Sequence, residues 1–277
     1  MKNTTVYVIL LIALSSLAAC SKSTPPIAPE KPIVIVPTTP PTTPVTPPPT
    51  TTIPPTSTAK LLPVKLESAT QSIVFKYIGE SNSLLSADNG AGKKVIIMYK
   101  DNQMNGLLIH EANKVHYVDY YRDEQKRIVK VIQWTQTESD DIPMGSYSIE
   151  YNEQQQISVI KYYTNKDQLL RTKLFAYALS TDQMGIVIET NGSESTRYTY
   201  DQKNGLFKNV ANVQFIALET GDHLFLSAEH NLLSISATTP KNDLTCSYEY
   251  NTDAYPSVIN WKTPQANMLF KVSYKTF

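Results

Sequence analysis

The amino-acid sequence predicts an all-β protein: an antiparallel β-meander of consecutive hairpins that forms a curled sheet or half-barrel, with a short helical or irregular insert. Apolar and polar residues alternate with period two through most of residues 60–277, as in strands with one buried face. The gaps between these segments are short and rich in Asp, Asn, Gly, Ser and Gln. Such short gaps join antiparallel neighbours, because a parallel crossover needs about a dozen residues or more.

Ten segments alternate clearly enough to be assigned as strands. They are 72–78, 94–100, 127–134, 147–152, 157–163, 173–179, 185–190, 196–200, 246–250 and 256–261. The stretch 206–234 departs from this pattern, because the spacing of Val210, Val213, Ala217 and Leu218 is nearer that of a helix. We expect short helical or irregular segments there, packed over one end or face of the sheet.

The first twenty residues, MKNTTVYVILLIALSSLAAC, have the order of a secretory signal. Lys2 precedes an apolar run, Val6–Leu14, that is too short to cross a bilayer, since this takes about 20 residues. The stretch ends in Leu17, Ala18, Ala19 and Cys20. This end resembles the lipobox of bacterial lipoproteins, which implies a signal peptide over 1–19, lipidation of Cys20 and attachment to a membrane. The alternative is an ordinary cleavage site with Cys20 there by chance.

Residues 20–59 form a Pro/Thr-rich segment, with thirteen of the 18 prolines between residues 21 and 59. Proline favours extended polyproline II, at about 3.1 Å per residue. We therefore expect a disordered stalk that holds a β-meander domain, residues 60–277, away from the membrane. A ligand for a proline-recognising module is the alternative. Ser21 is not the aspartate that retains many lipoproteins in the inner membrane, so we expect an outer-membrane lipoprotein, on the periplasmic face rather than the cell surface.

Five segments share an aromatic strand end, a polar turn and an aliphatic strand start. They are YYRDEQKRIVKV from Tyr120, YNEQQQISVI from Tyr151, YYTNKDQLLRTK from Tyr162, YTYDQKNGLFKNV from Tyr198 and YEYNTDAYPSVI from Tyr248. In YTYDQKNGLF we expect Asp201 and Gly205 to bend the chain into a hairpin turn, since Asp bonds the turn backbone and Gly accepts positive φ.

These segments resemble the YD-type repeat of RHS-like wall proteins. They resemble still more an uncharacterised group of β-rich Bacteroidetes lipoproteins, in which a YD…NPFKN-like segment precedes an irregular insert. Here Tyr200 and Asp201, followed by Phe207, Lys208 and Asn209, are similar. The resemblance implies a hairpin-based fold and brings no activity and no catalytic residues.

No catalytic, metal or cofactor motif stands out in the sequence, so we expect no enzyme, no metal and no cofactor. His223 and His230 flank LFLSAE, a weak metal signal, and the pair Asp140 and Asp141 is more simply a turn than the carboxylates of a hydrolase. Cys246 would have no partner and is expected to be a small buried side chain. The chain has 25 basic and 25 acidic residues and no basic block, which argues against nucleic acid binding.

The chain has seventeen tyrosines, and those on strands could cover the half-buried sheet or form an exposed row for a partner. Tyr198, Tyr200, Tyr248 and Tyr250 are the candidate binding aromatics. The first hypothesis is a non-enzymatic, monomeric domain that binds an envelope protein or glycan. The alternative is a carrier that holds an apolar ligand in the concavity of a half-barrel, capped by residues 206–234.

Replacing Cys20 by Ser should release the protein from the membrane fraction, because the thiol that accepts the lipid is removed. Fractionation of cells that produce the wild type and the variant checks this. Continued membrane association of the variant would contradict the lipoprotein assignment.

Overall fold

The computed structural model describes residues 60–112, 114–137, 140–178, 185–239 and 243–277. The chain divides into two units, residues 1–52 and 53–277, and every described residue belongs to the second. The expected signal peptide 1–19, Cys20 and the stalk to residue 59 lie outside the described residues. Within the described ranges, no helix has the length and apolar character needed to span a membrane.

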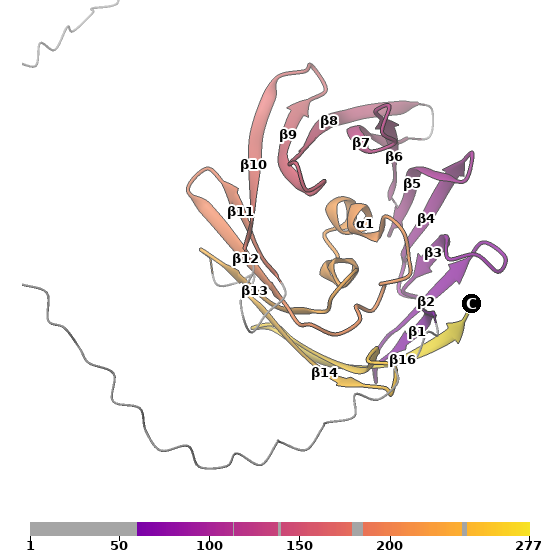
Figure 1. The fold of residues 1–277 in the computed structure, drawn as a ribbon. Coiled ribbons are helices and arrows are strands. Elements are labelled where there is room, and N and C mark those ends of the chain that lie inside the picture. The colour runs from indigo at the N-terminus through magenta and orange to yellow at the C-terminus, as the bar shows by residue number, and fades with distance from the viewer. Residues whose placement is uncertain (1–59, 113, 138–139, 179–184, 240–242) are drawn as a thin grey trace, which may run out of the picture. The chain divides into compact units, whose positions relative to one another are not determined.

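Sixteen strands form one closed antiparallel barrel, in which each strand pairs with its neighbours in sequence and β1 pairs with β16 (Figure 1). The strands are β1 (Leu61–Glu67), β2 (Ser72–Tyr77), β3 (Leu84–Asp88), β4 (Lys93–Lys100), β5 (Gln103–Glu111), β6 (Lys114–Arg122), β7 (Ile128–Gln136), β8 (Asp141–Tyr151), β9 (Ile157–Thr164), β10 (Leu169–Ala178), β11 (Gly185–Asn191), β12 (Glu194–Tyr200), β13 (Leu232–Ala237), β14 (Leu244–Tyr250), β15 (Pro256–Lys262) and β16 (Asn267–Thr276). The prediction of an all-β antiparallel fold is confirmed.

The prediction of a curled sheet or half-barrel is wrong, because the sheet closes on itself. Six strands were missed by the sequence pattern: β1, β3, β5, β6, β13 and β16. In several of them an outward position carries an apolar or aromatic residue, such as Leu85, Tyr121 or Leu269, which blurs the alternation. With these strands included, the first and last strands meet, and Leu66 lies opposite Val272.

The segment between β12 and β13 lies inside the ring of strands (Figure 1). We call residues 201–231 the insert; it contains the helix α1 (Val213–Thr220) and the 3-10 helix η1 (His223–Leu226). Buried insert side chains such as Phe207, Ile216 and Phe225 belong to the same hydrophobic cluster as inward residues of the barrel. The insert is therefore short-helical and packs over one face of the sheet, as expected; because the sheet is closed, this inner face encloses a lumen, and the insert fills part of it.

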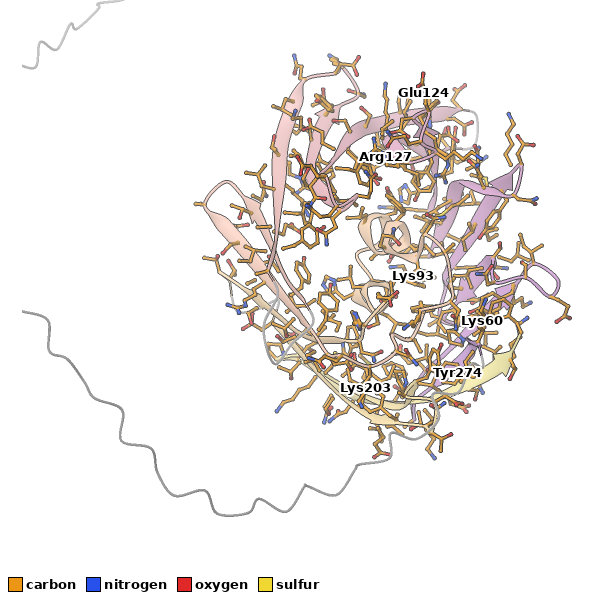
Figure 2. All side chains as sticks on the ribbon, viewed as in Figure 1. Lys60, Lys93, Glu124, Arg127, Lys203 and Tyr274 are labelled. Atoms are coloured by element: carbon orange, nitrogen blue, oxygen red, sulfur yellow. The ribbon has the colours of Figure 1, made fainter. Side chains whose placement is uncertain are left out.

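The ends of the insert are joined to each other by Asp201 and Asn231. The Asp201 N–H donates to the Asn231 carbonyl at 3.0 Å, and the Asp201 carboxylate accepts the Asn231 N–H and Nδ2, each at 3.1 Å. The Tyr250 hydroxyl also donates to this carboxylate. At the far end of α1, Lys93 of β4, which is labelled in Figure 2, donates from Nζ to the Thr220 carbonyl at 3.1 Å. The insert is thus fixed to the barrel at both ends of the lumen.

The hairpin turn expected in YTYDQKNGLF is wrong. Tyr200 ends β12, and the chain runs on as one side of the stem of the insert. The Gly205 N–H donates to the Glu229 carbonyl at 3.0 Å, and a Cβ at Gly205 would lie 1.9 Å from the Ala228 carbonyl oxygen. Gly205 serves this close backbone approach, and its φ is not in the left-handed region. The other four segments do form hairpins: β6–β7, β8–β9, β9–β10 and β14–β15.

Charged side chains occupy many outward positions of the strands. They alternate with buried or half-buried neighbours and are themselves exposed; examples are Lys76, Lys94, Lys130, Arg197, Glu249 and Lys271. The barrel thus has a largely apolar inner face, where the insert lies, and an outer face that mixes charged residues with apolar ones such as Leu174 and Leu269. This follows from the alternation of strand side chains between two faces.

Replacing Gly205 by Ala should lower the free energy of unfolding by roughly 3 kcal/mol or more, because backbone would have to move to admit the methyl group. The control is Gly90→Ala, at a position with φ of 65° and nothing within 4 Å of the added Cβ. That change should lower the free energy of unfolding by only about 1–2 kcal/mol, which is the penalty for placing alanine in the left-handed region. Urea unfolding of both variants checks this, and equal losses would contradict the role given to Gly205.

Candidate functional site

A cavity of about 420 Å³ remains in the lumen between the insert and the wall of strands β8–β12. We call it the lumen cavity. The fully buried inward residues lie mainly on the wall from β1 to β9, where the insert packs. On β10, by contrast, Phe175 is half-buried and Tyr177 is 39% exposed. The cavity therefore lies where the insert leaves the wall uncovered.

Five residues on the strand side of the lumen cavity carry aromatic rings. They come from inward positions on strand β8, strand β10 and strand β12: Tyr151, Phe175, Tyr177, Tyr198 and Tyr200. The Tyr151 hydroxyl donates to the Ile128 carbonyl at 2.8 Å, and the Tyr177 hydroxyl to the Ile157 carbonyl at 2.9 Å. These bonds hold the two rings in place, and the Arg127 guanidinium lies over the Tyr151 ring, 4.9 Å from its centroid.

The Tyr200 hydroxyl differs from these, because no described residue forms a hydrogen bond with it. Burial raises the pKa of this hydroxyl, so it keeps its proton at neutral pH and can donate. Because Tyr200 lines the lumen cavity, its hydroxyl can donate a hydrogen bond to a ligand or to water there.

One end of the lumen cavity carries charged groups that are already paired. Lys173 Nζ lies 2.7 Å from Glu189 Oε1, with the two side chains 19% and 14% exposed. The Tyr198 hydroxyl donates to the other Glu189 oxygen at 3.1 Å. His223 of η1 also lines the cavity, and burial lowers its pKa, so its imidazole is neutral at pH 7.

On the other side of α1, Glu219 anchors the helix to β7 and β8. Its carboxylate accepts hydrogen bonds from the Tyr147 hydroxyl and from Gln133 Nε2, the latter at 2.8 Å. Burial raises the pKa of the Glu219 carboxyl. This contact holds α1 toward β7 and β8, and Glu219 does not line the lumen cavity.

The four candidate binding aromatics are divided by the structure. Tyr198 and Tyr200 line the lumen cavity, whereas Tyr248 and Tyr250 do not. The Tyr248 hydroxyl donates to the Leu232 carbonyl at 2.6 Å, and the Tyr250 hydroxyl donates to Asp201. Tyr248 and Tyr250 therefore stabilise the inner wall and the ends of the insert.

The sequence analysis missed Lys173, Glu189 and His223 as cavity residues. Two of them could have been found from the alternation pattern. Lys173 lies two residues before Phe175 on β10 and so points to the same face as Phe175 and Tyr177. Glu189 pairs with Phe175 across the neighbouring strands, so its charge also falls on the apolar face. No signal in the sequence points to His223, because its position depends on the path of the insert.

The other residues weighed in the sequence do not converge. Cys246 is buried, as expected, and burial raises the pKa of its thiol to about 12. The Nδ1 of His230 lies 3.1 Å from the Lys203 carbonyl, and Asp140 lies in the turn before β8. Within the described ranges, no three His, Cys, Asp or Glu side chains are grouped to hold a metal ion.

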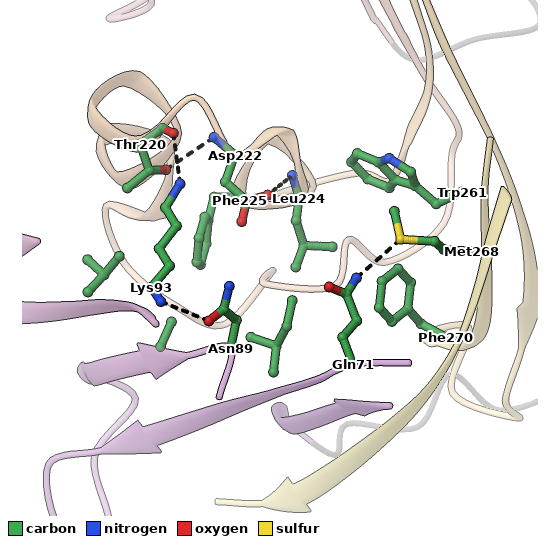
Figure 3. A pocket seen from close by; sticks show the side chains of 13 residues that line it. Gln71, Asn89, Lys93, Thr220, Asp222, Leu224, Phe225, Trp261, Met268 and Phe270 are labelled. Atoms are coloured by element: carbon green, nitrogen blue, oxygen red, sulfur yellow. Dashed lines mark hydrogen bonds between the residues drawn. The ribbon is translucent and has the colours of Figure 1, made fainter. Parts of the chain in front are cut away.

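A second pocket, of about 180 Å³, lies on the other side of the insert (Figure 3). Its polar side chains already serve the local structure. Lys93 binds the Thr220 carbonyl, and Asp222 accepts the Leu224 N–H at 3.1 Å. The Asn89 side chain accepts the Lys93 N–H at 3.0 Å. This pocket is smaller than the lumen cavity, and these contacts explain its polar lining without a ligand.

No family model matches the chain, and no curated protein matches it. Among solved structures, a porin-like protein from Bacteroides uniformis is similar with a TM-score of 0.45 and 11% identity, over 80% of this chain and 99% of that one. A porin-like protein from Bacteroides vulgatus is similar with the same score and identity, over 77% of this chain and 99% of that one. At this level of similarity, neither match identifies a family or a function for the chain.

Proposed function

We propose that the protein is a lipid-anchored binding protein of the bacterial cell envelope that holds a small apolar ligand in the lumen cavity. The observation that carries this proposal is the cavity itself: about 420 Å³, lined by aromatic rings on its strand side and bounded by an insert that the Asp201–Asn231 pair and the Lys93–Thr220 bond hold in place. Ligand sites in proteins typically have volumes of about 300–1,000 Å³, mostly apolar walls and a few placed polar groups.

Binding is favoured over catalysis by the chemistry of the lining. Among the described residues that line the cavity, none carries an aliphatic hydroxyl or a thiol that could act as a nucleophile. The one carboxylate, Glu189, is held by Lys173 and Tyr198. A general base must be free to reach its substrate, and this arrangement keeps Glu189 engaged.

Binding of a protein or glycan on an exposed tyrosine row, the first hypothesis from the sequence, receives less support. The four tyrosines proposed for it are partly buried and occupy inward strand positions, where they contact the cavity or other residues of the wall. The alternative from the sequence was a carrier, which requires an inward-facing cavity. The lumen cavity is such a cavity, although it lies in a closed barrel and not in a half-barrel.

The proposed location rests on the signal-like N-terminus with Cys20 and on the outer face of the barrel. A lysine or arginine on the lipid-facing side of a membrane barrel costs about 2–4 kcal/mol near the bilayer midplane. Exposed Lys76, Lys94, Lys130 and Arg197 on outward positions therefore favour an aqueous surrounding. In this proposal the membrane is reached through the lipid on Cys20, at the outer membrane and on its periplasmic face, and the barrel is a monomer. The resemblance to β-rich Bacteroidetes lipoproteins belongs to the same proposal.

Replacing Leu218 by Trp should reduce binding of N-phenyl-1-naphthylamine by about tenfold or more, because the larger side chain fills the lumen cavity. This uncharged probe fluoresces more strongly in apolar surroundings, so its titration into the purified protein measures affinity.

The matched control is Leu174→Trp, on the outward side of β10, where Leu174 is 51% exposed. It adds the same ring outside the cavity and should leave the affinity unchanged. Equal probe affinity in the Leu218→Trp variant, with its fold retained by circular dichroism, would contradict the proposed function.

A further inference from the structure

We infer that the ligand of the lumen cavity is an uncharged ring compound with a hydroxyl or carbonyl oxygen that hydrogen-bonds to Tyr200. This inference rests on the proposed function and adds the chemical class of the ligand.

The shape of the ligand follows from the wall. Phe175 and Tyr177 on β10 and Tyr198 and Tyr200 on β12 present aromatic side chains to the same cavity from two strands separated by β11. Consecutive inward positions on one strand are about 7 Å apart, so neighbouring rings on a strand are spaced by roughly the length of one or two fused rings. Aromatic side chains bind flat apolar bodies through large contact areas and offset stacking.

The charge of the ligand follows from the Lys173–Glu189 pair. Both side chains are largely buried, and their charges compensate each other at 2.7 Å. An anionic ligand beside Lys173 would also meet the Glu189 carboxylate, and a cationic ligand beside Glu189 would also meet the Lys173 ammonium group. Burial of a charge without a counter-charge is unfavourable, so the cavity selects against a charged ligand.

The neighbouring groups give no further charge to the cavity. His223 is neutral at pH 7, because burial lowers its pKa. Gln155 and Gln156 are exposed amides at the β8–β9 turn, each already accepting a hydrogen bond through Oε1: Gln155 from Arg127 and Gln156 from Asn152. Gln214 on α1 is exposed and uncharged. Nothing among the described lining residues offers an unpaired charge.

The Tyr200 hydroxyl indicates which polar atom the ligand carries. This hydroxyl keeps its proton, belongs to a residue that lines the cavity, and has no hydrogen-bond partner among the described residues. The hydroxyls of Tyr151, Tyr177 and Tyr198 are each bonded within the protein. Tyr200 is thus the tyrosine of this wall whose donor is free to bind an oxygen on the ligand.

Three probes with one ring system test the inference: 2-naphthol, naphthalene and 2-naphthoate, titrated at pH 7 into the purified full chain. We expect 2-naphthol to bind about three- to tenfold more tightly than naphthalene, the range of one net hydrogen bond. We expect 2-naphthoate to bind at least about tenfold more weakly than 2-naphthol, because its charge has no counter-charge in the cavity. Tyr200→Phe should reduce 2-naphthol affinity to that of naphthalene and leave naphthalene unchanged.

Tyr248→Phe is the matched control, since it removes a tyrosine hydroxyl outside the cavity and should not alter the order of the three probes. If 2-naphthoate binds as tightly as 2-naphthol, the ligand class is wrong while the proposed function stands. If 2-naphthol keeps its advantage over naphthalene in Tyr200→Phe, the recognition by Tyr200 is wrong and the inference fails. If none of the three probes binds, the proposed function fails with it.

Discussion

The structure depends on the need to fill a ring of sixteen strands. About eight strands enclose a space that side chains alone can fill, whereas sixteen enclose a much wider one. Here the insert, residues 201–231, supplies the missing core, with Phe207 packed edge-on to Phe75 of the wall at a centroid distance of 5.3 Å. An apolar lumen in water is stable only if it is occupied, so the pairing of Asp201 with Asn231 that holds the ends of the insert also supports the barrel.

The same constraint locates the candidate site. A single helix and its flanking segments are narrower than the lumen, and contacts such as Glu219 with Gln133 hold α1 toward β7 and β8. The wall from β9 to β12 is then left partly uncovered, and the lumen cavity results. Its aromatic surface comes from the period-two pattern of the strands, and its charged end comes from one lysine and one glutamate that satisfy each other.

Much of the fold could be predicted from the sequence, because alternation and short polar turns determine an antiparallel meander. The closure of the barrel could not be predicted, because it depends on recognising every strand. Strands such as β5 and β16 carry apolar residues on both faces, so the alternation does not reveal them. The alternation places Tyr198 and Tyr200 on the same face of β12, but it does not show that this face turns inward to the lumen cavity. The separation of these two from Tyr248 and Tyr250 depends on the path of the insert. That path is set by long-range contacts such as Asp201 with Tyr250, which no local pattern records.

The most direct test is a crystal structure of the protein with 6-bromo-2-naphthol, with the bromine located by its anomalous scattering. Binding in the lumen cavity predicts one bromine site inside the barrel, between the insert and strands β8–β12, with the ligand oxygen within hydrogen-bond distance of Tyr200. A bromine in the smaller pocket beside Lys93, or on the outer face of the barrel, would contradict it.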